Sequence, residues 1–204
     1  CPVRGRADLV SQLLDATVDG EHLSELEFQS FFMLLVVAGN ETTRSATAWG
    51  LHTLLKHPTQ LNALLQDPAL LDTAIEEILR YTPPVHHFRR TANRDLQLGD
   101  QQIREGDKVV MWYPSANRDA EVFDDPDRFD IRRDSREHVT FGFGEHYCLG
   151  ANLARMELQE IMAALVPHLG SLTLTGEAQP LRSNFINGLK HLPARFGDLR
   201  RATG

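Results

Sequence analysis

The 204-residue chain has little cysteine, no excess of basic residues and no long hydrophobic run. Its two cysteines, Cys1 and Cys148, do not form the disulfide framework of a small secreted domain. Lysine and arginine total 21 against 28 aspartate and glutamate, and the formal charge of −7 argues against binding along a phosphate backbone. We therefore expect a reducing compartment, the cytoplasm, and no nucleic-acid partner.

Membrane and secretory segments are also missing from the sequence. The longest strongly apolar stretch, residues 31–39, is about half as long as the roughly 20 residues that cross a bilayer. The chain opens with Cys1, without an initiator methionine or a signal-peptide pattern. We therefore expect that Cys1 is not the natural start and that upstream sequence of the whole protein is missing from this chain. Hydrophobic residues make up 42% of the chain, which is enough for the core of one domain or of part of a larger one.

A single long helix is predicted early in the chain. Ser24 and Glu27 form a capping box, and no helix-breaking residue follows across residues 25–57. The first half of this helix, residues 28–38, is apolar nearly all round and is expected to be buried.

Shorter elements are predicted after this helix. In chain order they are helices over 59–66 and 69–81, strands over 88–91, 96–98, 101–103 and 108–113, a helix over 151–165, and strands near 171–175 and 185–195. Pro167 and Gly170 are expected to end the last helix. Residues 114–140 are polar and irregular, which is long for a structureless connection, so we expect them to be functional or packed.

A glycine-rich loop, residues 141–150, places Cys148 immediately before a helix. Unpaired backbone N–H groups and the macrodipole at that position favour a thiolate. Glycines such as Gly144 and Gly150 let the backbone wrap closely, and Phe141 can shield one side, which suits a soft thiolate ligand of a metal such as haem iron. A buried, inert cysteine beside a tight turn is the alternative.

This loop resembles the cysteine-ligand loop of the cytochrome P450 family, because it meets the pattern Phe-x-x-Gly-x-x-x-Cys-x-Gly at every fixed position. Three further motifs of that family occur in the correct order: Ala-Gly-Asn-Glu-Thr-Thr at 38–43, Glu-x-x-Arg at 77–80, and Pro-Asp-Arg-Phe at 126–129. The resemblance implies a mainly α fold with small β-sheets, of which residues 1–204 are one partial domain, the carboxyl-terminal half. Members run to about 400 residues, so the chain is expected to be an incomplete fragment.

The resemblance also implies an activity. It is that of a haem-thiolate monooxygenase, which inserts one oxygen atom from dioxygen into a hydrophobic substrate, with Cys148 as the axial ligand of the metal, the iron of haem b (iron protoporphyrin IX). A thiolate ligand favours O–O cleavage. The electrons are expected from a partner such as ferredoxin with its reductase, because no flavin, nicotinamide or iron–sulfur site is legible. The tract over residues 182–193 is similar to bacterial members that act on steroids, terpenoids or branched lipids.

Further site residues follow from the same resemblance. Glu41 and Thr42 match an acid–alcohol pair that governs oxygen activation, and an acid and an alcohol can relay protons; simple polarity of a helix face is the alternative. His146 and Arg89 match residues that bind haem propionates, to which an imidazole or a guanidinium can donate hydrogen bonds. Because Arg90 is adjacent, the motif leaves some ambiguity about which of the two arginines matches.

Two more matches concern structure and substrate. In the family, the residues that correspond to Glu77, Arg80 and Arg128 form a buried network that fixes the core on the cysteine side. An exposed pair between the first two, contributing about 0.3 kcal/mol, is the alternative. Residues 84–88 and 184–189 match segments that face the substrate pocket.

Two other classes of function remain open from the sequence. One is a haem-binding sensor or carrier without turnover, and the other is a cofactor-free thiol enzyme with Cys148 as nucleophile and His146 as base. Arg132, Arg133 and Arg136 could attract an acidic electron donor, but acids intervene and a solvated face is the favoured interpretation.

Overall fold

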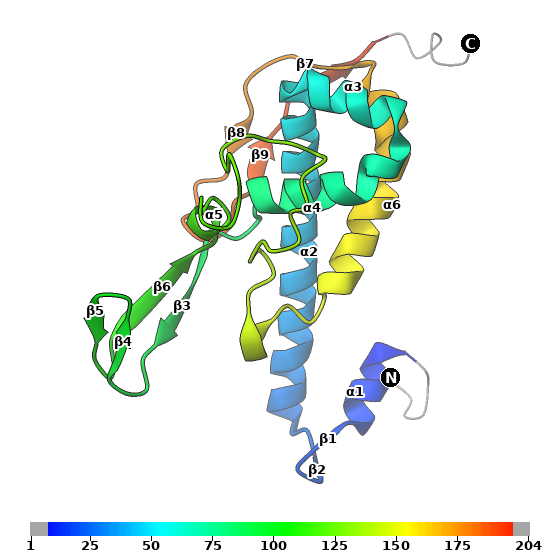
Figure 1. Cartoon of the computed structure of the whole chain (residues 1–204). Coiled ribbons are helices and arrows are strands. Elements are labelled where there is room, and N and C mark those ends of the chain that lie inside the picture. The colour runs from blue at the N-terminus through cyan, green and yellow to red at the C-terminus, as the bar shows by residue number, and fades with distance from the viewer. Residues whose placement is uncertain (1–7, 198–204) are drawn as a thin grey trace. The chain divides into compact units, whose positions relative to one another are not determined.

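The computed structural model describes residues 8–197, so the first of the two cysteines, Cys1, lies outside the described residues. The chain divides into two compact units, residues 1–41 and 42–204. The long helix α2, Glu25–Lys56, begins in the first unit and ends in the second (Figure 1). Within residues 8–197, no helix combines the length and the apolar character needed to cross a bilayer.

The first unit begins with a short helix and a hairpin that the sequence did not predict. Helix α1 spans Leu9–Asp15, and the carboxylate of Asp8 caps it by accepting a hydrogen bond from the backbone N–H of Ser11 at 2.9 Å. Strands β1, Thr17–Val18, and β2, Glu21–His22, pair antiparallel. A seven-residue helix and two-residue strands are too short to leave a clear periodic signal.

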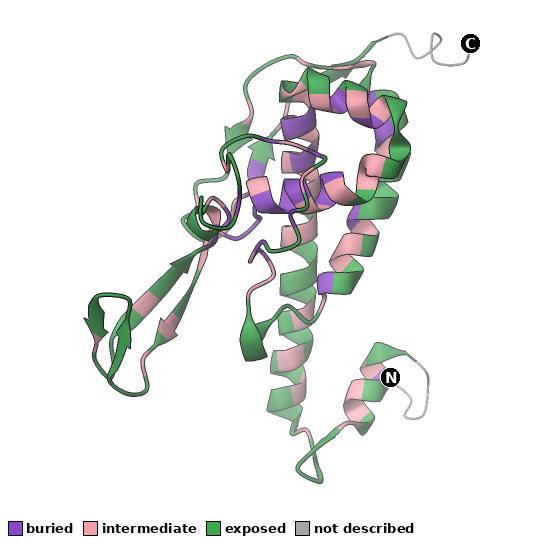
Figure 2. Cartoon of the chain, viewed as in Figure 1, coloured by how far each residue is buried: buried purple, intermediate pink, exposed green. Residues whose placement is uncertain are grey.

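Helix α2 confirms the predicted start. The Glu27 carboxylate accepts hydrogen bonds from the Ser24 backbone N–H at 2.8 Å and from its hydroxyl at 2.7 Å, as a capping box requires. The predicted burial of residues 28–38 is wrong, because Met33 and Val37 are 62% and 61% exposed. Figure 2 shows the early turns of α2 largely as exposed or intermediate. An apolar pattern says which side chains avoid water, but it does not say whether the same chain supplies a surface to cover them.

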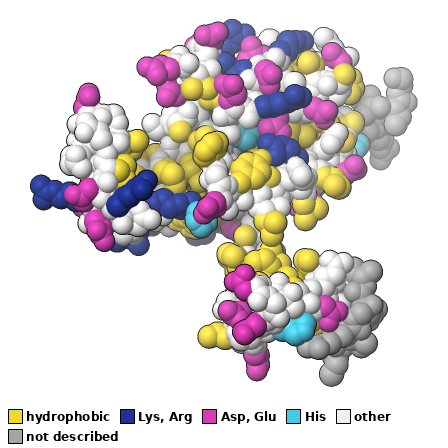
Figure 3. Space-filling model, turned by 60° about the horizontal axis from the view of Figure 1, so that its bottom comes forward, with side chains coloured by type: hydrophobic (Ala, Val, Ile, Leu, Met, Phe, Trp, Pro, Cys, Tyr) yellow, Lys and Arg dark blue, Asp and Glu magenta, His cyan; other side chains and the backbone are white. Residues whose placement is uncertain are grey.

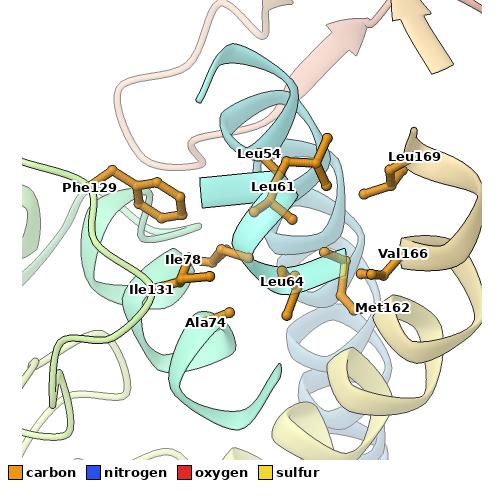
Figure 4. Packing of buried hydrophobic residues seen from close by; sticks show 10 residues of the cluster. All are labelled: Leu54, Leu61, Leu64, Ala74, Ile78, Phe129, Ile131, Met162, Val166 and Leu169. Atoms are coloured by element: carbon orange, nitrogen blue, oxygen red, sulfur yellow. The ribbon is translucent and has the colours of Figure 1, made fainter. Parts of the chain in front are cut away.

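Three helices of the second unit pack around the end of α2. They are α3, Pro58–Gln66, α4, Leu71–Tyr81, and α6, Ala151–Leu169; a 3₁₀ turn, η1, Pro68–Leu70, precedes α4. Figure 4 shows the buried side chains that these elements and the loop before the cysteine share: Leu54, Leu61, Leu64, Ala74, Ile78, Phe129, Ile131, Met162, Val166 and Leu169. This core confirms that the irregular stretch 114–140 is packed, because two of its side chains belong to the cluster.

Helix α6 is longer than predicted, because it continues through Pro167 to Leu169 before Gly170. A proline in the last turn removes a single backbone hydrogen bond. Val166 and Leu169 are buried in the core, and their burial offsets that loss.

The strands of the second unit form antiparallel pairs. They are β3, His87–Thr91, with β6, Lys108–Trp112; β4, Leu96–Leu98, with β5, Gln101–Ile103; β7, Leu172–Leu174, with β10, Ala194–Phe196; and β8, Gln179–Pro180, with β9, Leu189–His191. The four predicted strands over 88–113 are confirmed within one residue at their ends. Helix α5, Tyr113–Ala116, replaces the end of the fourth. The predicted strand over 185–195 is divided, because Pro193 cannot donate to a ladder.

Candidate functional site

The cysteine lies on a loop that turns back on itself. The backbone N–H of Cys148 donates to the carbonyl of Phe141 at 2.8 Å, so the two ends of the loop are tied together. Between them, Gly142 and Gly144 have φ values of 76° and 70°, which only glycine adopts readily. A 3₁₀ turn, η2, Gly144–His146, follows, and the exposed Cys148, which is not part of a disulfide, then leads into α6. The thiol is exposed, which rules out a buried, inert cysteine.

The glycines of the loop differ in their surroundings and in their backbone conformation. A Cβ at Gly142 would lie 3.3 Å from the hydroxyl oxygen of Tyr113 and 3.4 Å from the carbonyl oxygen of His146, so this position is both crowded and left-handed. Gly144 is left-handed, but a Cβ there would meet no described atom within 4 Å. Gly150 has an ordinary φ of −89° and the same open surroundings among the described residues. The fold alone therefore explains the first two glycines and not the third.

Large apolar side chains around the thiol are uncovered. Phe143 is 87% exposed, Leu149 80% and Tyr147 50%, although each stands within five residues of the cysteine. These features suit a flat apolar macrocycle with a central metal. The sulfur is a soft donor, the glycines have no side chains that would hold a ligand away from the backbone, and the apolar side chains are uncovered. The residues present therefore fit the haem that the sequence resemblance implies.

The predicted acid–alcohol pair lies on α2, on a different element from the loop. Glu41 and Thr42 are consecutive and half-buried within an unbroken helix. One turn further on, the hydroxyl of Thr47 donates to the carbonyl of Thr43 at 2.9 Å, so threonine back-bonding to the helix does occur in this stretch.

The strand β3 separates two adjacent arginines. Arg89 is exposed and Arg90 is half-buried, and successive residues of a strand point to opposite faces. Burial raises the pKa of the Tyr113 phenol, and the nearby charge of Arg90 partly offsets that rise. Phe88, on the same face as Arg90, has its ring centroid 6.0 Å from that of Tyr113. Because Tyr113 approaches Gly142, this face of β3 is the one that neighbours the cysteine loop.

The glutamate and arginine of the Glu-x-x-Arg motif form a buried pair, and the exposed alternative is wrong. Both Glu77 and Arg80 are 0% exposed. The guanidinium donates two hydrogen bonds to the carboxylate, from Nε to Oε2 at 2.7 Å and from Nη2 to Oε1 at 2.8 Å. It also donates to the carbonyls of Asn117 and Pro126, each at 2.8 Å. The pair therefore fastens α4 to the irregular stretch before the cysteine loop.

The third arginine of this network is Arg133, and the prediction of Arg128 is wrong. The side chain of Arg133 is 13% exposed, and its Nε lies 3.5 Å from Oε1 of Glu77. Arg128 contributes its carbonyl oxygen to Arg80, whereas its side chain is 61% exposed and pairs with Asp130. The solvated-face interpretation therefore fails for Arg133.

The two segments that were predicted to face the substrate pocket lie next to each other. They are residues 84–88 and 184–189. The backbone N–H of His86 donates to the carbonyl of Phe185 at 2.8 Å. The ring of Phe185 meets the ring of Phe88 edge-on, with centroids 5.4 Å apart. Both phenylalanines are 41% exposed, so the junction presents an aromatic surface.

One group of residues escaped the sequence prediction. Glu76 on α4 accepts a hydrogen bond from Nε of Arg155 on α6 at 2.6 Å and lies 3.1 Å from Nε2 of His138. Burial acts to raise the pKa of Glu76, but the hydrogen bonds from His138 and Arg155 outweigh it and lower the pKa to about 2. The same contact raises the pKa of Arg155. The acid and the arginine stand 79 positions apart, and no pattern along the chain connects them.

Comparison with known proteins agrees with this geometry. The family model described as Cytochrome P450 matches residues 3–191. The chain is 43% identical over 198 residues to the steroid C26-monooxygenase of Rhodococcus jostii (strain RHA1), which covers 97% of this chain and 41% of that protein. It is 47% identical over 191 residues to the methyl-branched lipid omega-hydroxylase of Mycobacterium bovis (strain ATCC BAA-935 / AF2122/97), which covers 93% and 45%.

A similar solved structure is that of CYP109E1 from Bacillus megaterium in complex with testosterone. It has a TM-score of 0.88 and 37% identity, over 94% of this chain and 54% of that one. The chain spans less than half the length of the two curated relatives. The match to the family over nearly its whole length, together with these relatives, shows that the chain belongs to the cytochrome P450 family, whose cofactor is haem b.

Proposed function

We propose that this protein is a haem-thiolate monooxygenase that inserts one oxygen atom from dioxygen into a hydrophobic steroid-like, terpenoid or lipid-like substrate. We further propose that the two units belong to one domain, because α2 runs through both and the family match spans residues 3–191. The observation that carries the function is the exposed thiol of Cys148 on a loop whose backbone is tied to Phe141 and whose apolar side chains are uncovered.

Cys148 is the residue that would hold the haem iron. A thiolate is a soft donor that gives electron density to iron, and the helix that begins just after it stabilises its negative charge. The haem, when bound, supplies the iron at which dioxygen is activated with two electrons. Gly144 and Gly150, which have open surroundings, let the macrocycle lie close to the backbone. Phe141 shields the loop on the side of α6, where the guanidinium of Arg155 lies over its ring.

Glu41 and Thr42 are the proposed proton carriers. Reduction of dioxygen to water and an inserted oxygen atom consumes two protons, and a carboxyl group and a hydroxyl group can pass them in turn. Both side chains are half-buried rather than fully enclosed, which supports exchange of protons with solvent.

The haem propionates are proposed to bind His146 and an arginine of β3. The sequence predicts Arg89 for this role, and its neighbour Arg90 is the stronger candidate on position. Arg90 shares the face of β3 that approaches Tyr113 and, through it, the cysteine loop. A guanidinium there can hold a carboxylate with two parallel hydrogen bonds.

The substrate is proposed to be large and apolar. The paired segments place Phe88 and Phe185 in edge-on contact, with Val85 and Ile186 bridged beside them. On the face drawn in Figure 3, hydrophobic side chains gather over the middle of the larger part. The two curated relatives are named for a steroid and for a methyl-branched lipid, which supports the same class of substrate.

The electrons are proposed to come from a separate donor such as ferredoxin with its reductase. No group of three or more metal-ligating side chains was found among residues 8–197, so this part of the chain supplies no second metal centre of that kind.

Isotope labelling tests the proposed reaction directly. The haem-loaded protein is incubated with a reductase–ferredoxin pair, ¹⁸O₂ and a panel of steroids, terpenoids and branched fatty acids. We expect one ¹⁸O atom in the product and the other in water, and Cys148→Ser is the matched control without product. Tight haem binding without any labelled product across the panel would favour a carrier or sensor instead.

A further inference from the structure

An ion pair between two helices lies beside the cysteine loop and takes no part in the roles described so far. Nε and Nη2 of Arg155 on α6 donate to Oε1 and Oε2 of Glu76 on α4, at 2.6 and 3.1 Å. The contact is bidentate, which is the strongest geometry for such a pair. The Glu76 side chain is 12% exposed, so water screens the pair only in part.

The same arginine contacts the two aromatic rings of the loop. Its Cζ lies 4.4 Å from the centroid of the Phe141 ring, within the range of a cation–π contact. Its Nη1 lies 3.4 Å from the hydroxyl oxygen of Tyr147. The two rings also touch each other, with centroids 6.3 Å apart. One guanidinium therefore contacts the first side chain of the loop and the side chain that directly precedes Cys148.

A histidine completes the contact from the other side. The backbone N–H of Thr140 donates to Nδ1 of His138 at 3.2 Å, so Nδ1 is an acceptor and Nε2 carries the proton. That Nε2 donates to Oε2 of Glu76 at 3.1 Å, and the imidazole lies 5.8 Å from the Phe141 ring. Arg155 and His138, which both contact the Phe141 ring, are therefore both bonded to Glu76.

Phe141 in turn fixes the backbone of the cysteine. Its carbonyl accepts the N–H of Cys148 at 2.8 Å, so the backbone of Phe141 and the backbone that carries the thiol are joined directly. We infer that Glu76 and Arg155 are positioning residues for the Cys148 thiolate, and that they act on it through Phe141. This inference rests on the proposed function, because it concerns the state of a haem ligand.

Loss of the ion pair should release the loop. The thiolate would then exchange more readily for a protonated thiol or another ligand, and more water would reach the sulfur. Both changes alter the electron density at iron, and therefore its reduction potential. A role limited to packing α4 against α6 would lower the stability of the whole fold and leave the potential of the folded protein unchanged.

The test compares four variants in the haem-loaded, reduced protein under carbon monoxide. They are Arg155→Met, Arg155→Lys, Glu76→Gln and, as a matched control, Arg136→Gln. Arg136 is an exposed arginine that lines a cleft together with Glu76 and Arg155. The measurements are the rate at which the strongly red-shifted Soret band of thiolate-bound haem is lost, the reduction potential, and global unfolding by circular dichroism.

We expect Arg155→Met to lose the red-shifted band about tenfold faster than the parent, which corresponds to about 1.4 kcal/mol. Glu76→Gln should behave in the same way. Arg155→Lys, which keeps a charge near the Phe141 ring, should fall between, and Arg136→Gln should match the parent. The reduction potential should shift in the first two variants at temperatures where both remain fully folded.

Two results would overturn the inference. An unchanged band lifetime and potential in both Arg155→Met and Glu76→Gln, with the band present in the parent, would overturn it alone. If Arg155→Met does not fold, Glu76→Gln and Arg155→Lys decide the question by the same readouts. Absence of the red-shifted band in the parent protein would overturn the proposed function, and this inference with it.

Discussion

Arg128 and Arg133 stand five positions apart in the stretch before the cysteine loop, but replacing them should lower the stability of the fold by very different amounts. Arg133 is nearly buried, with its Nε 3.5 Å from Glu77, and its Nη2 donates to the carbonyls of Asp125 and Arg128 at 3.0 and 3.2 Å. Its Nη1 donates to a third carbonyl, that of Asp124. Arg128→Gln, by contrast, removes a 61% exposed side chain with one ion pair.

The expected magnitudes follow from these contacts. Arg133→Gln removes three hydrogen bonds at about 1 kcal/mol each, so the free energy of unfolding should fall by about 3 kcal/mol. At a urea dependence of about 3 kcal/mol per molar, the unfolding midpoint should fall by about 1 M. Arg128→Gln should cost about 0–1 kcal/mol, as exposed pairs do. The assay is urea unfolding of the haem-loaded protein, followed by circular dichroism. Equal losses in the two variants would refute the assignment of Arg133 to the buried network.

Three other outcomes are expected. The pKa of Glu76 is lowered from 4.5 to about 2, so its carboxylate stabilises the fold above about pH 4.5 and loses this contribution as the pH falls towards 2. After allowance for solvent screening, the stability gap between the parent and Glu76→Gln should narrow by about 1–2 kcal/mol from pH 6 to pH 3, and a constant gap in urea titrations would contradict this. Arg90→Gln should weaken haem binding by about tenfold or more in a hemin titration, and Arg89→Gln should weaken it less; the reverse order would favour Arg89 as the propionate donor. Thr42→Ala should divert electrons to hydrogen peroxide and lower product formation at least about tenfold, and unchanged coupling of electrons to product would exclude the proton-carrier role.

Sequence patterns predicted the parts of the structure that depend on neighbours along the chain. The capping box at Ser24 and Glu27 marks the start of α2, and the strands near residues 96–103 have the bounds that turn chemistry predicts. The burial of the Glu77 and Arg80 pair was predicted from its family motif. The spacing of three residues alone would have allowed an exposed pair as well.

The sequence did not predict what depends on the direction of side chains in irregular backbone. Arg128 and Arg133 stand in one loop, and only the path of that loop decides which guanidinium turns towards Glu77. At Arg89 and Arg90 an error of one residue in strand register exchanges the two faces, so a motif with two adjacent arginines is ambiguous.

The other differences between the predicted and the observed structure have two causes. One is contact between segments that are distant in the sequence, and the other is that part of the apolar surface is not covered by other described residues. Glu76 and Arg155 meet because α4 packs beside α6, which no local pattern encodes. The apolar stretch over residues 28–38 has the composition of a buried helix, yet much of it is exposed. Composition predicts the need for a covering surface and not its source.

The central claim is that the sulfur of Cys148 binds the haem iron as a thiolate. The most direct measurement is the absorption spectrum of the reduced, haem-loaded protein under carbon monoxide, recorded beside that of Cys148→Ser at equal haem content. With a thiolate on the iron, we expect a strongly red-shifted Soret band in the parent protein and its complete absence in the variant. A parent spectrum with the band at its ordinary position, or a red-shifted band that survives in Cys148→Ser, would show that Cys148 is not the thiolate ligand.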